Sequence, residues 1–240
     1  MTKNLSRRAM LGTAAVGLAA VTANTADAQL RDPQRSAAAR RKKMPNYPNK
    51  HYYKDGQFDA NAAKNAVIEL LEYHHYPIYP ALKENMYVTD FGIGKFTEVG
   101  LAGVMFANKL DGEFNYMMQD LFLMPNQMLP EHWHIKPEDA KTGGPQKDEG
   151  WLIRWGRSYV VGEGEPNLPV EVKVPASHGD VTVKHCIIAD PGTFVPLSKV
   201  GTHHWQYGGS EGVILTEVAN YHTDTMVRLL NETANKAFGN

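Results

Sequence analysis

The chain has 240 residues, with 25 lysines and arginines against 26 aspartates and glutamates, and its formal net charge is −1. A charge so close to zero gives no electrostatic basis for binding nucleic acid, and we expect no nucleic-acid partner. The single cysteine, Cys186, excludes an internal disulfide. The fold must therefore be stabilised by packing, and Cys186 is expected in the core.

The first 28 residues have the pattern of an export signal. Arg7 and Arg8 precede an uncharged, alanine-rich stretch, and an "ADA" cleavage site ends at Ala28. The paired arginines favour the twin-arginine route, with an ordinary Sec signal as the alternative. We therefore expect residues 1–28 to be removed and the mature protein to be exported or periplasmic. No later segment is long and apolar enough to cross a membrane, so none is expected to contact one.

Two further regions follow the signal. Residues 29–50 are polar and basic, with "RRKK" at residues 40–43. This composition predicts a flexible leader, and an arm that packs on a partner subunit is the alternative. Residues 51–240 are long enough for a single domain with a substantial core.

The domain begins with one helical pattern and continues with strands. Apolar residues recur at helical spacing between Asp59 and His74, and Asp59 can cap the helix. From Tyr87 onward, short runs rich in Val, Ile, Phe, Thr and Tyr alternate with turn residues, which indicates a sandwich or barrel. The stretch "DTMVRLLNETANKAF" near the end predicts a short terminal helix. The fold class is therefore mainly β with an N-terminal helix and a short C-terminal helix.

The stretch "LPEHWHIKPED" places two histidines and a carboxylate close together. On a strand, His132 and His134 point to the same side and Trp133 to the other. Glu138 follows four residues after His134, within reach if the chain turns at the intervening proline. Two imidazoles and a carboxylate on one wall form a facial set of metal ligands, which leaves positions open for water or substrate.

A fourth ligand is sought in "SKVGTHHWQY". His203 and His204 follow Gly201, about 70 residues after the first pair. Antiparallel barrels bring such distant strands side by side. Only one of two adjacent histidines faces the interior of an extended strand. A strand that starts after the glycine turn favours His204, with His203 as the nearest competitor.

These two stretches together carry a family resemblance. "PEHWHIKPED" followed by "GTHHW" resembles the two halves of the cupin metal site, a His-x-His…Glu motif and a Gly-x-x-His motif. The resemblance implies a single-domain jelly-roll β-barrel. It also implies that His132, His134, Glu138 and His204 hold one divalent metal ion.

Three further stretches resemble the D-lyxose isomerase family within the cupins: "VTDFGIGKF", the "KPED" run that contains Lys136 and Glu138, and "EV…HTD" from Glu217 to Asp224. They occur in the family's order over roughly residues 88–224. The resemblance implies a metal-dependent aldose–ketose isomerase that converts D-lyxose to D-xylulose, with mannose to fructose as a second reaction of the same type, through a metal-bound enediolate. It implies manganese as the ion, although zinc and iron accept the same ligands.

Isomerisation also requires a base and groups that hold the sugar. Glu217 lies in the strand-like run "VILTEVA" and is the expected base, and Lys136 is expected to polarise the substrate oxygens. Asp224 and His222 are expected to hold sugar hydroxyls, and Trp205 to offer an apolar face to the ring. For each residue a purely structural role is the alternative: a solvent-facing Glu217, a solvated Lys136, a packed Trp205.

Two other functions remain open at this point. The same ligand set serves other cupin metalloenzymes, namely dioxygenases and lyases, and an exported cupin could also bind a sugar without turning it over. A small-molecule sugar is the expected ligand in the isomerase reading. A homodimer is expected because cupins often associate through their sheets.

Overall fold

The computed structural model describes residues 44–110, 114–136 and 146–239. The predicted signal, most of the basic leader and Glu138 lie outside the described residues. The described residues form one compact unit. Among the described residues, no helix is both long enough and apolar enough to span a bilayer.

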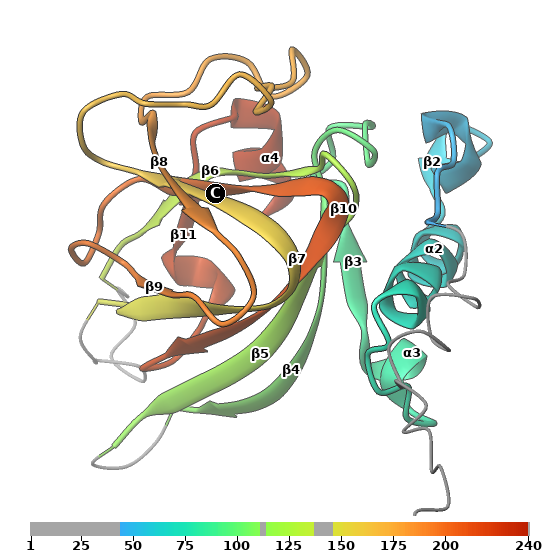
Figure 1. The fold of residues 1–240 in the computed structure, drawn as a ribbon, viewed down its shortest axis with the longest axis horizontal. Coiled ribbons are helices and arrows are strands. Elements are labelled where there is room, and N and C mark those ends of the chain that lie inside the picture. Colours follow the sequence, from blue (N-terminus) through green and yellow to red (C-terminus); the bar gives the residue numbers. More distant parts are fainter. Residues whose placement is uncertain (1–43, 111–113, 137–145, 240) are drawn as a thin grey trace, which may run out of the picture. The chain divides into compact units, whose positions relative to one another are not determined.

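The predicted N-terminal helix is α2, Ala60–Tyr73. Asp59 caps it as expected: its Oδ1 accepts hydrogen bonds from the backbone N–H groups of Asn61 and Ala62, at 2.9 and 3.1 Å. The buried face of α2 includes Val67, Leu70 and Leu71, which pack with Phe122 and Ile214 of the sheet in one hydrophobic cluster. The helix therefore covers part of the sheet's outer surface (Figure 1).

The described chain forms a small hairpin and one large antiparallel sheet. The hairpin joins β1 Tyr53–Lys54 to β2 Gln57–Phe58 and follows the short helix η1 Asn49–Tyr52. The short helix α3 Leu82–Asn85 lies at the other end of α2 (Figure 1). The sheet's strands are β3 Tyr87–Thr89, β4 Leu101–Lys109, β5 Tyr116–Leu123, β6 Met128–His134, β7 Glu149–Gly162, β8 His185–Ala189, β9 Phe194–Pro196, β10 His204–Ala219 and β11 Val227–Leu229. Their order is β11-β6-β10-β5-β4-β3, and β7 pairs with β10, β8 and β9.

The sheet is curled because its two longest strands bend (Figure 1). β10 pairs with β6 over its first residues and with β5 only from Val213 onward. Its pairing with β7 is interrupted between Gly208 and Val213. Gly156 and Gly212 lie at this bend with φ of +73° and +67°, a conformation that favours glycine. A Cβ at Gly156 would overlap the Gly212 carbonyl oxygen, so the two strands approach too closely for any side chain there.

The mainly β prediction with two flanking helices is confirmed, but the C-terminal helix is shorter than predicted. Residues 224–226 form the 3₁₀ helix η2 Asp224–Met226, and residues 227–229 form β11. Only α4, Glu232–Ala237, is α-helical, and Asn231 caps it by accepting a hydrogen bond from Ala234 N–H. β11 pairs with β6, with Val227 opposite His134. Pairing with an available sheet edge thus overrides the local helical pattern.

Candidate metal centre

Three histidines and a glutamate from three strands meet inside the curl of the sheet. β6 contributes His132 and His134 on one face, and β10 begins with His204, directly opposite His132 in the strand register. β7 begins with Glu149. Their candidate ligand atoms all lie within 4.8 Å of one another, and all four residues are buried. We refer to these four residues as the His–Glu cluster.

Backbone carbonyls orient two of the imidazoles. His132 Nδ1–H donates to the Pro130 carbonyl oxygen at 2.8 Å, and His204 Nδ1–H donates to the Thr202 carbonyl oxygen at 3.0 Å. A carbonyl can only accept, so these bonds place the proton on Nδ1 and leave the Nε2 lone pair free. Hydrogen bonds of this kind fix the tautomer and ring orientation of metal-binding histidines.

The inner atoms of the cluster are buried without hydrogen-bond partners. Glu149 Oε1 lies 2.9 Å from His134 Nε2 and 3.1 Å from His204 Nε2. None of these three atoms makes a hydrogen bond of acceptable geometry, and both nitrogens of His134 are in this state. Buried polar atoms are rarely left unsatisfied in native proteins. Three imidazole nitrogens and one carboxylate oxygen that converge in this way fit a divalent transition-metal ion.

The protonation states also fit a metal site. Burial lowers the pKa of His132 well below its usual value, and neighbouring His204 and His134 lower it further. Burial lowers the pKa of His134 to about 4, although Glu149 opposes the shift. Burial alone would raise the pKa of Glu149, but Lys147 and His134 hold it well below its usual range. His132 and His134 are therefore neutral and the Glu149 carboxylate is ionised near pH 7, as metal ligands must be.

The histidines are thus where the sequence placed them, whereas the carboxylate in the cluster is Glu149. Glu138 lies outside the described residues, so its role as a ligand stays a prediction. Glu149 carries a sequence signal of its own. Glu149 is the first residue of β7, and Trp151 and Ile153, two and four residues later, are 2% and 0% exposed. Alternate residues of a strand face the same side, so Glu149 points into the core with them.

A second polar group lies beside the cluster, around Glu217. Lys147 Nζ is 2.6 Å from Glu217 Oε1 and 2.7 Å from Glu149 Oε2, and it bridges the two carboxylates. Gln119 Nε2 donates to Glu217 Oε2 at 3.2 Å, and Tyr87 OH donates to Gln119 Oε1 at 2.9 Å. Glu217 is therefore held at both oxygens, facing the interior rather than solvent.

The buried lysine of the site is Lys147, which the sequence reasoning missed. Lys136, the residue predicted to polarise the substrate, is exposed and does not line the cavity. Burial alone would lower the pKa of Lys147, but Glu149 and Glu217 outweigh it and raise the pKa to about 12. The ammonium group is charged, and its charge offsets one of the two carboxylates that it joins.

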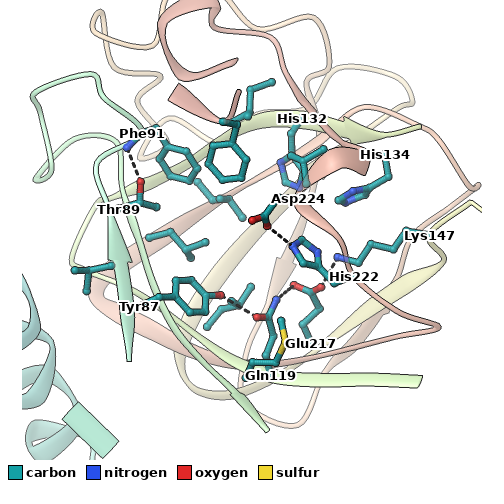
Figure 2. Close-up of a pocket in the computed structure, with 18 residues that line it drawn as sticks. Tyr87, Thr89, Phe91, Gln119, His132, His134, Lys147, Glu217, His222 and Asp224 are labelled. Carbon is teal, nitrogen blue, oxygen red and sulfur yellow. Dashed lines mark hydrogen bonds and ion pairs between the residues drawn. The ribbon is translucent and has the colours of Figure 1, made fainter. Parts of the chain in front are cut away.

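A cavity of about 390 Å³ opens between these groups (Figure 2). His132, His134, Lys147 and Glu217 line it, together with both residues of the "HTD" stretch predicted to hold sugar, His222 and Asp224. His222 Nε2 is 3.2 Å from Asp224 Oδ1. The Asn108 side chain holds the backbone of loop residue His222. Its Oδ1 accepts a hydrogen bond from His222 N–H, and its Nδ2 donates one to the His222 carbonyl oxygen.

The remaining predicted sugar contact, Trp205, lies elsewhere. Its side chain is fully buried, and its Nε1–H donates to the Val183 carbonyl oxygen at 3.0 Å. It packs with Met128 and Val161 in a cluster outside the cavity. Trp205 follows His204 on β10, and alternation along the strand turns it to the opposite face, so the structure gives it a packing role.

His203, the competitor for the fourth position, also faces away from the cluster. Its ring stacks on Trp133 with centroids 4.2 Å apart, and its Nδ1 is 2.8 Å from Glu131 Oε1. His204 is therefore the histidine of this pair that joins His132 and His134.

The chain resembles known sugar isomerases in sequence. The D-lyxose isomerase family matches residues 82–237. The D-lyxose ketol-isomerase of Cohnella laeviribosi is 34% identical over 163 residues, which is 68% of this chain and 85% of that protein. The chain belongs to the D-lyxose isomerase family. Another relative, the D-lyxose/D-mannose isomerase of Thermosediminibacter oceani, is 33% identical over 159 residues, 66% of this chain and 83% of its own length.

Solved structures agree with this family assignment at the level of the fold. The L-ribose isomerase of Cellulomonas parahominis, solved with L-ribose, covers 73% of this chain and 92% of its own, with a TM-score of 0.56 and 14% identity. The L-ribose isomerase of Acinetobacter sp. DL28 has a TM-score of 0.55 at 12% identity, covering 74% of this chain and 93% of its own. These likenesses show the fold alone. They confirm that this member of the D-lyxose isomerase family has the predicted cupin-type β architecture.

Proposed function

We propose that this member of the D-lyxose isomerase family interconverts D-lyxose and D-xylulose, and D-mannose and D-fructose, with a divalent ion held by the His–Glu cluster. The observation that carries the proposal is the bridge formed by Lys147, which joins a cluster carboxylate, Glu149, to a second buried carboxylate, Glu217, in one cavity. The site therefore holds a candidate base beside a candidate metal ligand.

The reaction moves one proton between C2 and C1 of the sugar and redistributes the protons on O1 and O2. Glu217 is placed to take the proton from C2 and return it to C1 by way of an enediolate. A divalent ion, when bound, would draw electron density from the two substrate oxygens and stabilise negative charge on them. Manganese is the expected ion, and zinc and iron fit the same three nitrogens and one carboxylate.

Each remaining group has a role that its contacts support. Gln119 and Lys147 each hold one oxygen of Glu217, which fixes the carboxylate as a base must be fixed. His222 and Asp224 line the cavity as a bonded pair and are placed to contact sugar hydroxyls. Lys147 also balances charge, because Glu149 and Glu217 would otherwise be buried without the ammonium group that they share.

Turnover is the decisive test. Protein purified without added metal is analysed for bound metal, then loaded with manganese, and incubated with D-lyxose and with D-mannose while D-xylulose and D-fructose are assayed. Formation of neither ketose would overturn the proposal. Oxygen consumption by an iron-loaded sample would favour a dioxygenase instead, and saturable sugar binding without turnover would favour a binding protein.

We also propose that the protein is exported by the twin-arginine route and that it is a homodimer. Of the predicted leader, residues 29–50, the described end belongs to the domain, because Met44 and Tyr47 pack against the core cluster and η1 begins at Asn49. We propose a flexible leader only before Met44. Support for the dimer comes from an apolar strip on the outer sheet face, where Met118 pairs with Val218 on one side and Ala107 on the other. Met118 and Val218 are 43% and 39% exposed. N-terminal sequencing of the exported protein tests cleavage after Ala28, and light scattering of the purified protein tests the homodimer. A mature N-terminus other than Gln29, or a monomeric mass, would contradict the respective one.

A further inference from the structure

The cavity is polar at one end and apolar at the other (Figure 2). Strand register shows where the change occurs. Gln119 of β5 lies opposite Glu217 of β10, and the next inward-facing pair is Leu121 opposite Leu215. The polarity therefore changes within one inward-facing step, which is roughly 7 Å along the strands.

The apolar end is a continuous surface. Most of the apolar residues that line the cavity belong to one hydrophobic cluster. Val88 and Met105 are outside it, and Met105 lies at the polar end, opposite Gln119. Phe91 and Phe238 stack with ring centroids 5.7 Å apart and close the wall next to α4. The apolar wall consists of Phe91, Leu101, Leu121, Leu129, Leu229 and Phe238.

Polar side chains near this wall already have partners. Thr89 Oγ1 accepts a hydrogen bond from Phe91 N–H at 2.9 Å. Tyr87 OH donates its proton to Gln119 Oε1 at 2.9 Å. Among the described side chains that line this end, the Thr89 hydroxyl is the one group left for a substrate hydroxyl at the apolar wall, since its O–H is not used in the bond from Phe91 N–H. A substrate hydroxyl there would exchange several water partners for at most this one.

On the proposed function, C1 and C2 of the sugar lie at the polar end, beside Glu217 and the His–Glu cluster. The opposite end of the sugar then extends toward the apolar wall. A hydroxyl there is disfavoured, since an unpaired buried polar group loses its hydration, whereas a methyl group gains by burial.

We propose that the site prefers 6-deoxyaldohexoses to the corresponding aldohexoses. The reaction is the same isomerisation, from a 6-deoxyaldose to its 6-deoxyketose. It conserves all atoms and electrons, and it needs no co-reactant. This inference rests on the proposed function and concerns only which substituent at C6 the cavity accepts.

Three sugars with the same configuration from C2 to C4 separate the inference from the function on which it rests. D-Lyxose has no C6, D-mannose has a hydroxymethyl group at that end, and 6-deoxy-D-mannose has a methyl group. We expect kcat/KM for 6-deoxy-D-mannose to exceed that for D-mannose by about tenfold, the scale of discrimination that apolar pockets achieve for small groups. A ratio of one or less, with D-lyxose or D-mannose turned over, overturns the inference. Absence of turnover with all three sugars overturns the proposed function itself.

A matched pair of variants locates the preference in the wall. Leu101 lies on β4 two inward-facing positions before Met105, the residue opposite Gln119, and it is only partly buried. Leu101→Gln adds hydrogen-bonding atoms to the wall and should reduce the 6-deoxy preference about threefold or more, while Leu101→Met should retain it. D-Lyxose turnover shows whether each variant is folded and active. An unchanged ratio in an active Leu101→Gln protein overturns the assignment to this wall. If that variant does not fold, the three-sugar comparison on the unmodified protein decides.

Discussion

Lys147 and Glu217 form a buried ion pair, with Nζ 2.6 Å from Oε1 and side chains that are 3% and 5% exposed. Because the same ammonium also binds Glu149, the pair couples the expected base to the metal cluster. Removal of the positive charge at Lys147 therefore affects both the metal cluster, through Glu149, and the expected base, Glu217. The exposed Lys136 offers a matched control for the loss of a lysine outside the cavity.

Lys147→Met is expected to lower the free energy of unfolding by about 3–5 kcal/mol, because it leaves two buried carboxylates without their counter-charge. It should also lower isomerase activity. Lys136→Met should change stability by no more than about 0.5 kcal/mol, as is usual for exposed positions. Urea denaturation of both metal-free variants measures the difference. Equal effects of the two substitutions would contradict the role given to Lys147.

Glu217→Gln is expected to lower kcat by about 100-fold to 10,000-fold, the range associated with loss of a general base. The amide keeps the volume and can still bond to Gln119, so bound metal should remain near the level of the unmodified protein. Glu232→Gln, at a side chain that is 91% exposed, is the control and should leave both quantities unchanged. Activity retained in Glu217→Gln would remove Glu217 as the base.

The sequence was sufficient to place the three histidines, because alternation along a strand puts His132 and His134 on one face and a strand start selects His204. It was not sufficient for Glu149 and Lys147. These residues reach the cluster through the curl of β7 against β10, which is a tertiary relationship with no fixed spacing from His134. The sequence analysis instead selected Lys136 and Glu138 of the "KPED" run, because they follow His134 at the fixed spacing of a known motif.

The same distinction explains the C-terminal segment. Asn231 caps α4 as local preferences predict, so the helix itself follows from the sequence. Val227 and Leu229 lie in the stretch predicted to be helical, but they are two residues apart, as on one face of a strand, and they pair with β6 and line the cavity. An available sheet edge determines the secondary structure of such a short segment. The hydrophobic periodicity of the sequence does not show where that edge lies.

Glu149→Gln and Glu138→Gln together test which carboxylate completes the metal site. Glu149 Oε1 lies between two imidazole nitrogens, so Glu149→Gln should weaken metal binding by about 10-fold to 100-fold or more. Glu138→Gln should have little effect if Glu149 is the ligand. Competition with a chelator measures the dissociation constant of each variant. Loss of affinity only in Glu138→Gln would restore the ligand set that the motif predicts.

The metal-free protein is expected to lose stability as the pH falls from about 6.5 to about 4. Burial lowers the pKa of His134 to about 4 in the folded protein, whereas an unfolded chain has an ordinary value of about 6.5. Between these values the unfolded chain binds more protons, so acid favours unfolding, by up to about 1.4 kcal/mol per pH unit for each such group. Urea midpoints at pH 7, 6 and 5 measure the slope. His134→Asn should make the slope shallower, with the remainder due to His132, whose pKa burial also lowers. An equally steep slope in that variant would contradict the contribution of His134.

Glu131 and His203 form a bond on the outer face of the two strands that carry the ligands. Glu131 precedes His132 and His203 precedes His204, and the 2.8 Å contact between Oε1 and Nδ1 joins β6 to β10 at the register pair of the two ligands. Glu131 is fully buried, and its other oxygen accepts from Thr182 N–H at 2.7 Å. This contact should hold the ligand strands in register.

Glu131→Gln removes the charge from that contact while keeping its volume, so we expect metal affinity to fall by up to about tenfold although no ligand atom changes. His203→Gln should have a similar effect, and the double variant should lose less than the sum of the two, because both substitutions break one contact. Metal titration by calorimetry measures all three, with thermal unfolding of the metal-free forms alongside. A lower Tm with unchanged metal affinity would mean that the bond stabilises the fold without positioning the ligands.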